Sequence, residues 1–368
     1  NGIVYSLFIG VVASVAALLL RPFISVLGVW MSGAGDDVTA VSDMALPYYD
    51  MLVWSIMPLM VFLAVKQFLE GIGNTKVAMW ITLSGNLLNI FLNWVFIFGN
   101  LGSEAMGAEG AGLATLLSRV MQMVAIVAYF YLSRRLRIYR SFFSHDAISR
   151  LLMRRCVAIG FPISFQMVLE SAAFILSSIL SLSFGAAASG AMQVAFSIAN
   201  IAWMITVAVG SAATIMVSHI YGAKSREELR PTIVATFHLG LMWAVTMAFI
   251  FVLARGALVG IFSDNAEVVA LSANLLLLIA IYQFSDAIQG LSISMLRGLQ
   301  DVKIIMPIVI CSYLVRNIPL GTLLAYHFDM GCYGLAIGLI IGLTAAAVMT
   351  YMRVRRNVRL FEQDTLNG

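Results

Sequence analysis

The chain has 368 residues, of which 61% are hydrophobic and only 11% are charged, and its formal net charge is +4 at pH 7. A soluble domain would carry about a quarter charged residues, and a transmembrane β-barrel would alternate apolar and polar residues instead of forming solid apolar blocks. The three cysteines lie far apart without a CxxC pair, so neither a disulfide framework nor a zinc site is indicated. The sequence therefore predicts an all-α polytopic membrane protein.

Ten apolar runs are long enough to cross a bilayer as helices. In chain order we expect them at residues 3–30, 46–69, 77–98, 110–132, 157–184, 188–220, 234–262, 267–296, 304–327 and 332–352. The connecting loops alternate in charge, and every second loop holds basic residues such as Lys76, Lys224 and Lys303. Because basic loops stay in the cytoplasm, we expect the C-terminus inside. The basic residues then report orientation, and no nucleic-acid partner is predicted.

The chain also repeats itself. FLEGIGNTK (68–76) aligns with MLRGLQDVK (295–303), and AEGAGLA (108–114) aligns with GCYGLA (331–336). The first four spans therefore match the last four, whereas the two spans within 157–220 have no upstream counterpart. We infer a parent architecture of twelve helices in two six-helix lobes, of which ten are present here. Two more helices are expected upstream of the first residue.

This organisation predicts four segments. Residues 1–132 form an incomplete N-terminal lobe with helices 3–6 of the inferred twelve, and residues 157–353 form a C-terminal lobe with helices 7–12. Residues 133–156 form a basic cytoplasmic linker, and residues 354–368 form a cytoplasmic tail.

Polar side chains recur at helical spacing in three spans of the C-terminal lobe. The stripes are Gln166, Glu170, Ser177 and Ser181, then Gln193, Ser197 and Asn200, then Tyr282, Gln283, Asp286 and Gln289. Carboxylates inside a membrane are tolerated where they face a wet cavity, so these stripes predict such a cavity. Asp286 is then expected to bind a cation. The alternative is a structural role, in which Asp286 pairs with an Arg or with backbone groups.

The N-terminal lobe carries a weaker pattern. Asn86, Asn89 and Asn93 share one face of their span, and Thr115 could reach the same cavity from the next span. Two interpretations stay open, a polar binding surface and interhelical amide hydrogen bonds that hold the helices together.

Three other residues in the predicted spans stand apart from these stripes. Arg21 is expected to snorkel to the membrane interface. Pro162, which precedes Glu170 in the same span, is a candidate hinge. Asp50 is given no role.

Four segments carry a family resemblance. They are GFPISFQMVLES (160–171), YQFSDAIQGLSISMLRGLQD (282–301), NLLNIFLNWVFIFG (86–99) and GAEGAGLATLLSR (107–119). Together they resemble the multidrug and toxic compound extrusion (MATE) family, and within it the NorM-type branch. The resemblance implies a two-lobed bundle of twelve helices and places Glu170 and Asp286 in the cation and substrate site of the C-terminal lobe. Asn93 stands where other MATE branches carry an Asp, so a charged N-terminal site would depend on the absent first helix.

The function implied is export of organic cations or drugs by antiport with Na⁺ or H⁺, with no cofactor and no catalytic residue. The expected binding residues are Glu170, Asp286, Gln166, Tyr282, Gln283, Gln289, Asn200, Asn89, Asn93 and Thr115. Glu170 and Asp286 are also the candidates for holding Na⁺. We expect a monomer surrounded by membrane lipid, in a bacterial inner membrane.

Two rival functions remain. A lipid-linked oligosaccharide flippase of the same superfamily would usually have more helices and a cationic cavity to meet a pyrophosphate, whereas the stripes here are acidic and neutral. An intramembrane transferase would need clustered acids or a catalytic histidine. The four histidines, His145, His219, His238 and His327, form no such cluster.

Overall fold

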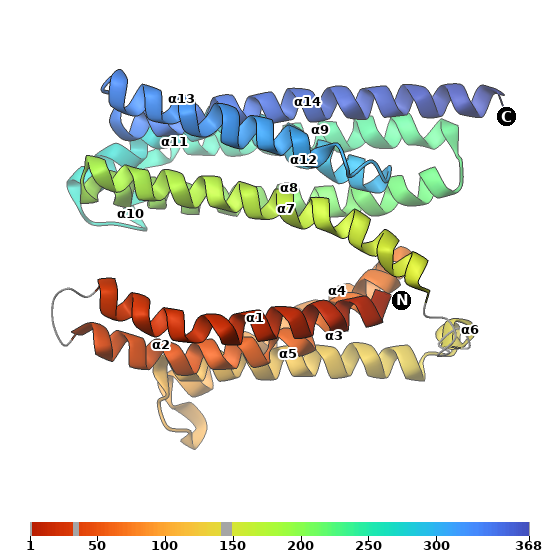
Figure 1. The fold of residues 1–368 in the computed structure, drawn as a ribbon, viewed down its shortest axis with the longest axis horizontal. Coiled ribbons are helices and arrows are strands. Elements are labelled where there is room, and N and C mark those ends of the chain that lie inside the picture. The colour runs from red at the N-terminus through yellow and green to blue at the C-terminus, as the bar shows by residue number, and fades with distance from the viewer. Residues whose placement is uncertain (1, 32–36, 141–148, 368) are drawn as a thin grey trace. The chain divides into compact units, whose positions relative to one another are not determined.

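The structure of the protein is a computed structural model, and it describes residues 2–31, 37–140 and 149–367. Within those ranges the chain is helical nearly throughout and contains no β-strand (Figure 1). Ten helical spans there are long and apolar enough to cross a bilayer. The prediction of an all-α polytopic membrane protein is confirmed.

The chain divides into two compact units, Asn1–Cys156 and Val157–Gly368. The helices of the first unit are α1 (Gly2–Met31), α2 (Asp37–Trp54), α3 (Ile56–Gly71), α4 (Thr75–Phe98), α5 (Gly107–Leu132) and α6 (Arg137–Arg140). Those of the second are α7 (Arg150–Ser181), α8 (Ala186–Gly222), α9 (Arg226–Leu253), α10 (Arg255–Gly260), α11 (Ala266–Gly298), α12 (Ile305–Val309), α13 (Ile318–Thr322) and α14 (Gly331–Asn367). The boundary falls inside α7, at the end of the predicted linker. The assignment of the units as transport lobes stays a prediction.

The predicted span 46–69 is confirmed as Ala45–Gly71, but its helix is interrupted at Ser55, because α2 ends at Trp54 and α3 begins at Ile56. Pro58 has no amide hydrogen to donate to the carbonyl four residues back, which favours a break there. The Ser55 hydroxyl donates to the carbonyl of Leu52 at 2.6 Å, and the Arg119 guanidinium of α5 donates to that same hydroxyl. Polar side chains of the first unit therefore form hydrogen bonds at the break between the two helices.

Arg21 and Asp50 form an ion pair between α1 and α2. The Arg21 Nη2 atom lies 2.8 Å from Asp50 Oδ2. Arg21 is thus not a lone snorkelling side chain, and Asp50 acquires a structural partner.

In the second unit α11 packs against α8, α9 and α14. Its apolar positions Leu275, Leu276 and Leu291 are fully buried. The facing side of α8 carries small buried residues, among them Ala191 and Ala195, and small residues let helices approach closely inside a membrane. α11 is therefore held in place on several sides, and the polar groups that it carries are held with it.

The span Ile305–His327 is helical but irregular. Between α12 and α13 it widens into a π-helix, Ile310–Asn317, and it ends in a second one, Leu323–His327. Pro319 lacks the amide hydrogen that a regular helix would direct to the carbonyl of Val315, which favours the wider winding. The π-helix redirects side chains that a regular helix would place elsewhere.

Glycines of α14 allow this irregular span to pack closely on it. A Cβ added to Gly334 would lie 2.5 Å from the Ala325 amide nitrogen, and one added to Gly342 would lie 2.7 Å from the Asn317 Cβ. A Cβ on Gly338, between them, would meet the backbone of Gly321. The two backbones are therefore in direct contact along two turns of α14.

α14 continues through the predicted tail to Asn367, so the prediction that the last helix ends near residue 352 was wrong. Val354 and Val358, one turn apart, are buried in the core of the unit. Arg353 and Asn357 lie beside them and both donate to Asp301 Oδ2, each at 2.6 Å. Packing and an ion pair therefore hold the tail in the helix.

Asp301 lies in the loop between α11 and α12 and connects that loop to α14. Burial alone would raise the pKa of Asp301, but the hydrogen bonds from Arg353 and Asn357 and the charges of Arg353 and Arg356 outweigh it, so its pKa lies below the ordinary value. An acid whose pKa falls on folding stabilises the folded state above its unfolded pKa, which is about 3.9. That stabilisation is lost as the pH falls through the lower, folded pKa.

We expect Asp301→Asn to lower the free energy of unfolding by about 1 kcal/mol at pH 7. Thermal unfolding of the purified protein in detergent at several pH values measures this. The melting temperatures of the wild type and the variant should converge as the pH falls below about 4, where the wild-type carboxylate takes up a proton. Asp329→Asn, at an exposed position, is the matched control. A constant gap between wild type and variant down to acid pH would contradict the prediction.

Candidate cation site

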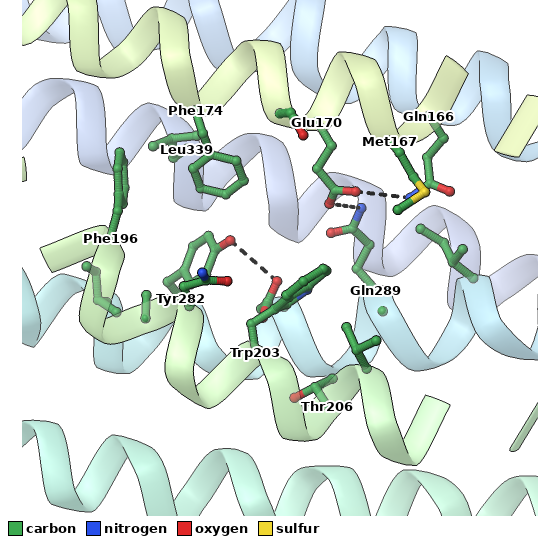
Figure 2. A pocket seen from close by; sticks show the side chains of 18 of the residues that line it. Gln166, Met167, Glu170, Phe174, Phe196, Trp203, Thr206, Tyr282, Gln289 and Leu339 are labelled. Carbon is green, nitrogen blue, oxygen red and sulfur yellow. Dashed lines mark hydrogen bonds between the residues drawn. The ribbon is translucent and has the colours of Figure 1, made fainter. Parts of the chain in front are cut away.

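The second unit holds a cavity of about 480 Å³ between α7, α8, α11 and α14. Figure 2 shows that Glu170 and Gln166 enter it from α7, and Tyr282 and Gln289 from α11. Phe174, Phe196 and Trp203 line its apolar part. The Phe174 ring packs edge to face on those of Phe196 and Tyr282. The cavity therefore combines carboxylates with aromatic surfaces.

Glu170 is held by three hydrogen-bond donors. Gln166, one turn earlier in α7, donates to Oε2 at 3.0 Å, and Gln289 of α11 donates to Oε1 at 3.3 Å. The Tyr313 hydroxyl donates to Oε1 at 2.9 Å and lies 3.3 Å from Gln289 Oε1. Amide and hydroxyl donors of this kind fix an ionised carboxylate in one orientation.

Asp286 has a sparser environment. It is 3% exposed, and it accepts a 3.4 Å hydrogen bond from the Tyr282 hydroxyl one turn earlier in α11. Among the described residues no basic side chain lies within ion-pair distance of it. A carboxylate has room for about four hydrogen bonds, so most of the acceptor capacity of Asp286 is open to a cation in the cavity.

The prediction missed Tyr313 and Arg297, and it also missed five lining residues with hydroxyl groups, which are Ser171, Thr206, Ser211, Thr214 and Ser294. Tyr313 lies on the π-helix Ile310–Asn317, whose winding a regular helical period does not follow. Arg297 lies just beyond the predicted span 267–296, but in the structure it belongs to the last turn of α11 and lines the cavity. Gln289, Ile293 and Arg297 are spaced four residues apart, so extending the α11 stripe by two turns would have included Arg297.

The predicted stripes of the second unit are shorter than expected. Asn200 and Ser197 line the cavity from α8. Gln283 is buried but is not among the lining residues, and Gln193 is exposed. Ser177 and Ser181 also lie outside the lining, and each donates to a carbonyl of its own helix, those of Ala173 and Ser178. The cavity is therefore lined by the first residues of the α7 stripe and the last residues of the α8 stripe.

The predicted residues of the N-terminal lobe lie in the first unit. Asn93 donates to Asn89 Oδ1 at 3.0 Å within α4, and Thr115 donates to the carbonyl of Ala111 within α5. Asn93 Oδ1 is buried without a hydrogen-bond partner among the described residues. Asn86 is exposed. A binding role for Asn89, Asn93 and Thr115 stays a proposal.

Within the described ranges no group of three or more His, Cys, Asp or Glu side chains could hold a metal ion. The cavity instead offers two separate carboxylates together with amide and hydroxyl oxygens. Oxygen ligands of this kind suit hard cations. The chemistry available is reversible binding of a small cation or of an organic one, whose charge an aromatic ring such as Trp203 can also attract.

Comparisons with known proteins identify the family. The MatE family model matches residues 1–95 and 162–323. Multidrug resistance protein NorM of Vibrio vulnificus strain YJ016 is 30% identical over 361 residues, which are 96% of this chain and 79% of that protein. The probable multidrug resistance protein NorM of Mannheimia succiniciproducens is 33% identical over 302 residues, 81% of this chain and 65% of that protein.

Solved structures show the same fold. A eukaryotic MATE transporter superposes with a TM-score of 0.84 at 20% identity, covering 99% of this chain and 80% of that one. A MATE protein crystallised in a bent conformation gives the same TM-score at 20% identity, covering 99% and 78%. The chain belongs to the MatE family, that of the multidrug and toxic compound extrusion transporters, and within it to the NorM-type branch.

Proposed function

We propose that this protein exports organic cations or drugs by antiport with Na⁺ or H⁺, and that Glu170 and Asp286 form the exchange site. The observation that carries the proposal is a cavity inside a membrane-spanning unit with two carboxylates and aromatic walls. Its volume of about 480 Å³ lies within the range of sites that bind drug-sized molecules. The NorM relatives are named multidrug resistance proteins, which supports a drug as the substrate.

Coupling follows from the cost of charge in the membrane. A lone ionised carboxylate in a membrane interior costs a few kcal/mol or more, so the cavity is most stable when a cation occupies it. A proton or Na⁺ meets this need, and so does a cationic drug. Because these cations compete for the same oxygens, entry of one releases the other. Downhill movement of the small ion can then drive export of the large one.

The two carboxylates are suited to different tasks. Asp286, with one hydrogen-bond donor, exposes more acceptor capacity to a cation, whereas Glu170 is oriented by Gln166, Gln289 and Tyr313. Tyr282, Gln289 and Asn200 supply further polar groups. We propose that a small ion uses both carboxylates together with these neighbours.

The first unit would contribute to substrate binding without supplying a charge. Asn89, Asn93 and Thr115 would give neutral hydrogen-bonding positions along the substrate route. The unpartnered Asn93 oxygen is the observation that favours this role over purely structural amide bonds.

The protein is an integral membrane protein, as its spans require. From the basic loops we propose a cytoplasmic C-terminus, and from the bacterial NorM relatives we propose a location in a bacterial inner membrane. We also propose that the protein is a monomer. Labelling of a cysteine placed at Ser225 by an impermeant thiol reagent outside intact cells would contradict this orientation. Chemical crosslinking in the membrane that captures a dimer would contradict the monomer.

Arg297 bears on the flippase alternative, because it brings a cation into the cavity. One guanidinium beside two carboxylates leaves the cavity acidic, and an acidic cavity repels a pyrophosphate. The charge of the site therefore favours organic cations over lipid-linked oligosaccharides.

Transport into vesicles tests the proposed function. The purified protein is reconstituted in liposomes loaded with ethidium, and a Na⁺ gradient or a pH gradient is imposed separately. We expect dye movement that depends on one of the gradients and stops when an ionophore collapses that gradient. Empty liposomes are the control. Dye movement equal to that control under both gradients would reject the proposal.

A further inference from the structure

Arg297 enters the cavity from the last turn of α11. Its Nη2 atom donates to Gln166 Oε1 at 2.9 Å, and its Nε is buried without a hydrogen-bond partner among the described residues. No described carboxylate lies within ion-pair distance of the guanidinium. Arg297 is half-buried, and an arginine removed from water without a direct anionic partner is costly, so its position calls for a reason other than packing.

Gln166 separates Arg297 from Glu170. Its carbonyl oxygen accepts from Arg297, and its amide nitrogen donates to Glu170 Oε2 at 3.0 Å. The amide is therefore oriented from both sides, because the oxygen must face the cation and the nitrogen the anion. A direct ion pair would occupy Glu170, whereas this arrangement leaves its charge available while keeping a cation close by.

The charge of the cavity can be counted. Among its described lining residues only Glu170, Asp286 and Arg297 carry a formal charge. An arginine side chain stays protonated in proteins, so the cavity has a net charge of −1 when both carboxylates are ionised. One monovalent cation then makes it neutral, whereas a dication would leave an excess positive charge in a region of low dielectric.

We propose that Arg297 is a built-in cation that fixes the net charge of the cavity at −1 and so selects monovalent over divalent organic cations. The inference rests on the proposed function, since it takes the cavity to be the cation site. It adds a residue that determines specificity through charge, with Gln166 holding that residue away from Glu170.

Binding of two probes to the purified protein in detergent tests the proposal. The probes are tetraphenylphosphonium, a monocation, and methyl viologen, a dication, and equilibrium dialysis gives the Kd of each. Arg297→Gln should improve binding of the dication relative to the monocation by about tenfold. Removing one positive charge from the cavity strengthens its attraction for every positive charge on a probe, and the dication carries one more such charge than the monocation. Arg297→Lys keeps the charge and should keep the wild-type ratio. Arg316→Gln removes an arginine outside this cavity and is the matched control.

A double variant separates charge from folding. Glu170→Gln alone leaves a net cavity charge of zero, and Glu170→Gln with Arg297→Gln leaves −1. The ratio of dication to monocation affinity should therefore rise by about tenfold from the single to the double variant, even if Arg297→Gln alone does not fold. Two outcomes would overturn the inference while the site itself stands. One is a ratio of dication to monocation affinity that is equal in the wild type and Arg297→Gln, and also equal in Glu170→Gln and the double variant. The other is a shifted ratio in Arg297→Lys. A wild-type protein that binds neither probe would overturn the proposed site and this inference together.

Discussion

Replacing Asp286 with Asn is expected to reduce gradient-driven efflux of ethidium to the level of empty vesicles. The amide keeps the size of the side chain and an oxygen for the Tyr282 hydroxyl, but it loses the charge. At a separation of about 8 Å and an effective dielectric constant of about 20, one unit of charge is worth about 2 kcal/mol, or about thirtyfold in cation affinity. The neutral side chain also cannot exchange a proton, so coupling is lost as well. Initial efflux rates in the reconstituted system measure both effects.

Glu170→Gln should be equally inactive in the same assay but less stable. Glu170 accepts from Gln166, Gln289 and Tyr313, and the new amide group would direct its own donors at one or more of these donors. An unsatisfied buried donor costs about 1–3 kcal/mol. Asp286→Asn has one such contact to keep, so it should unfold closer to the wild-type temperature.

Asp329→Asn is the matched control for both variants, because it removes an exposed carboxylate at the end of the segment before α14. It should transport at the wild-type rate. If Asp286→Asn and Glu170→Gln also export at that rate, the exchange site is assigned to the wrong residues.

Gly338→Leu is expected to have the largest effect on stability. A Cβ at this position would meet the backbone of Gly321, which cannot move aside as a flexible side chain can. The two helices would have to separate, and the span Ile305–His327 would lose its contact with α14. We expect a loss of about 3 kcal/mol or more in the free energy of unfolding. The yield of monodisperse protein and its thermal unfolding in detergent measure this.

Gly256→Leu makes the same substitution where nothing lies within 4 Å of the added Cβ. It should be recovered at the wild-type yield with a melting temperature close to that of the wild type. A Gly338→Leu variant that unfolds at the wild-type temperature would show that the close packing of these helices is not required. Because Tyr313 lies on the displaced span, the fold and the orientation of Glu170 should be lost together.

Much of the cavity could be predicted from helical spacing. Glu170, Asp286 and Gln289 are polar groups in long apolar runs, and the period of a regular helix puts them on inward faces. The same rule failed for Tyr313, because the π-helix shifts the direction of its side chains. It also failed to distinguish Trp203 and the phenylalanines of the cavity, since aromatic residues are equally common on lipid-facing surfaces.

The helices themselves could also be predicted only in part. The number of membrane spans was evident from hydropathy, whereas the break at Ser55 and the length of α14 were not. The cluster of arginines after residue 352 suggested a solvated tail. Val354 and Val358, at a spacing of one turn, indicate a buried helical face within that cluster, but only the packed structure shows what they pack against.

The length of α14 has a consequence for the membrane surface. Its 37 residues extend over about 55 Å at 1.5 Å per residue, whereas the hydrocarbon core of a bilayer is about 30 Å thick. α8 has the same length, and the ring of Tyr221 near its end lies 5.2 Å from that of Phe361 in α14. Both helices must therefore rise beyond the acyl chains side by side. Arg355, Arg356 and Arg359 are exposed on this protruding part, where we expect them to meet the phosphate layer and bind anionic headgroups.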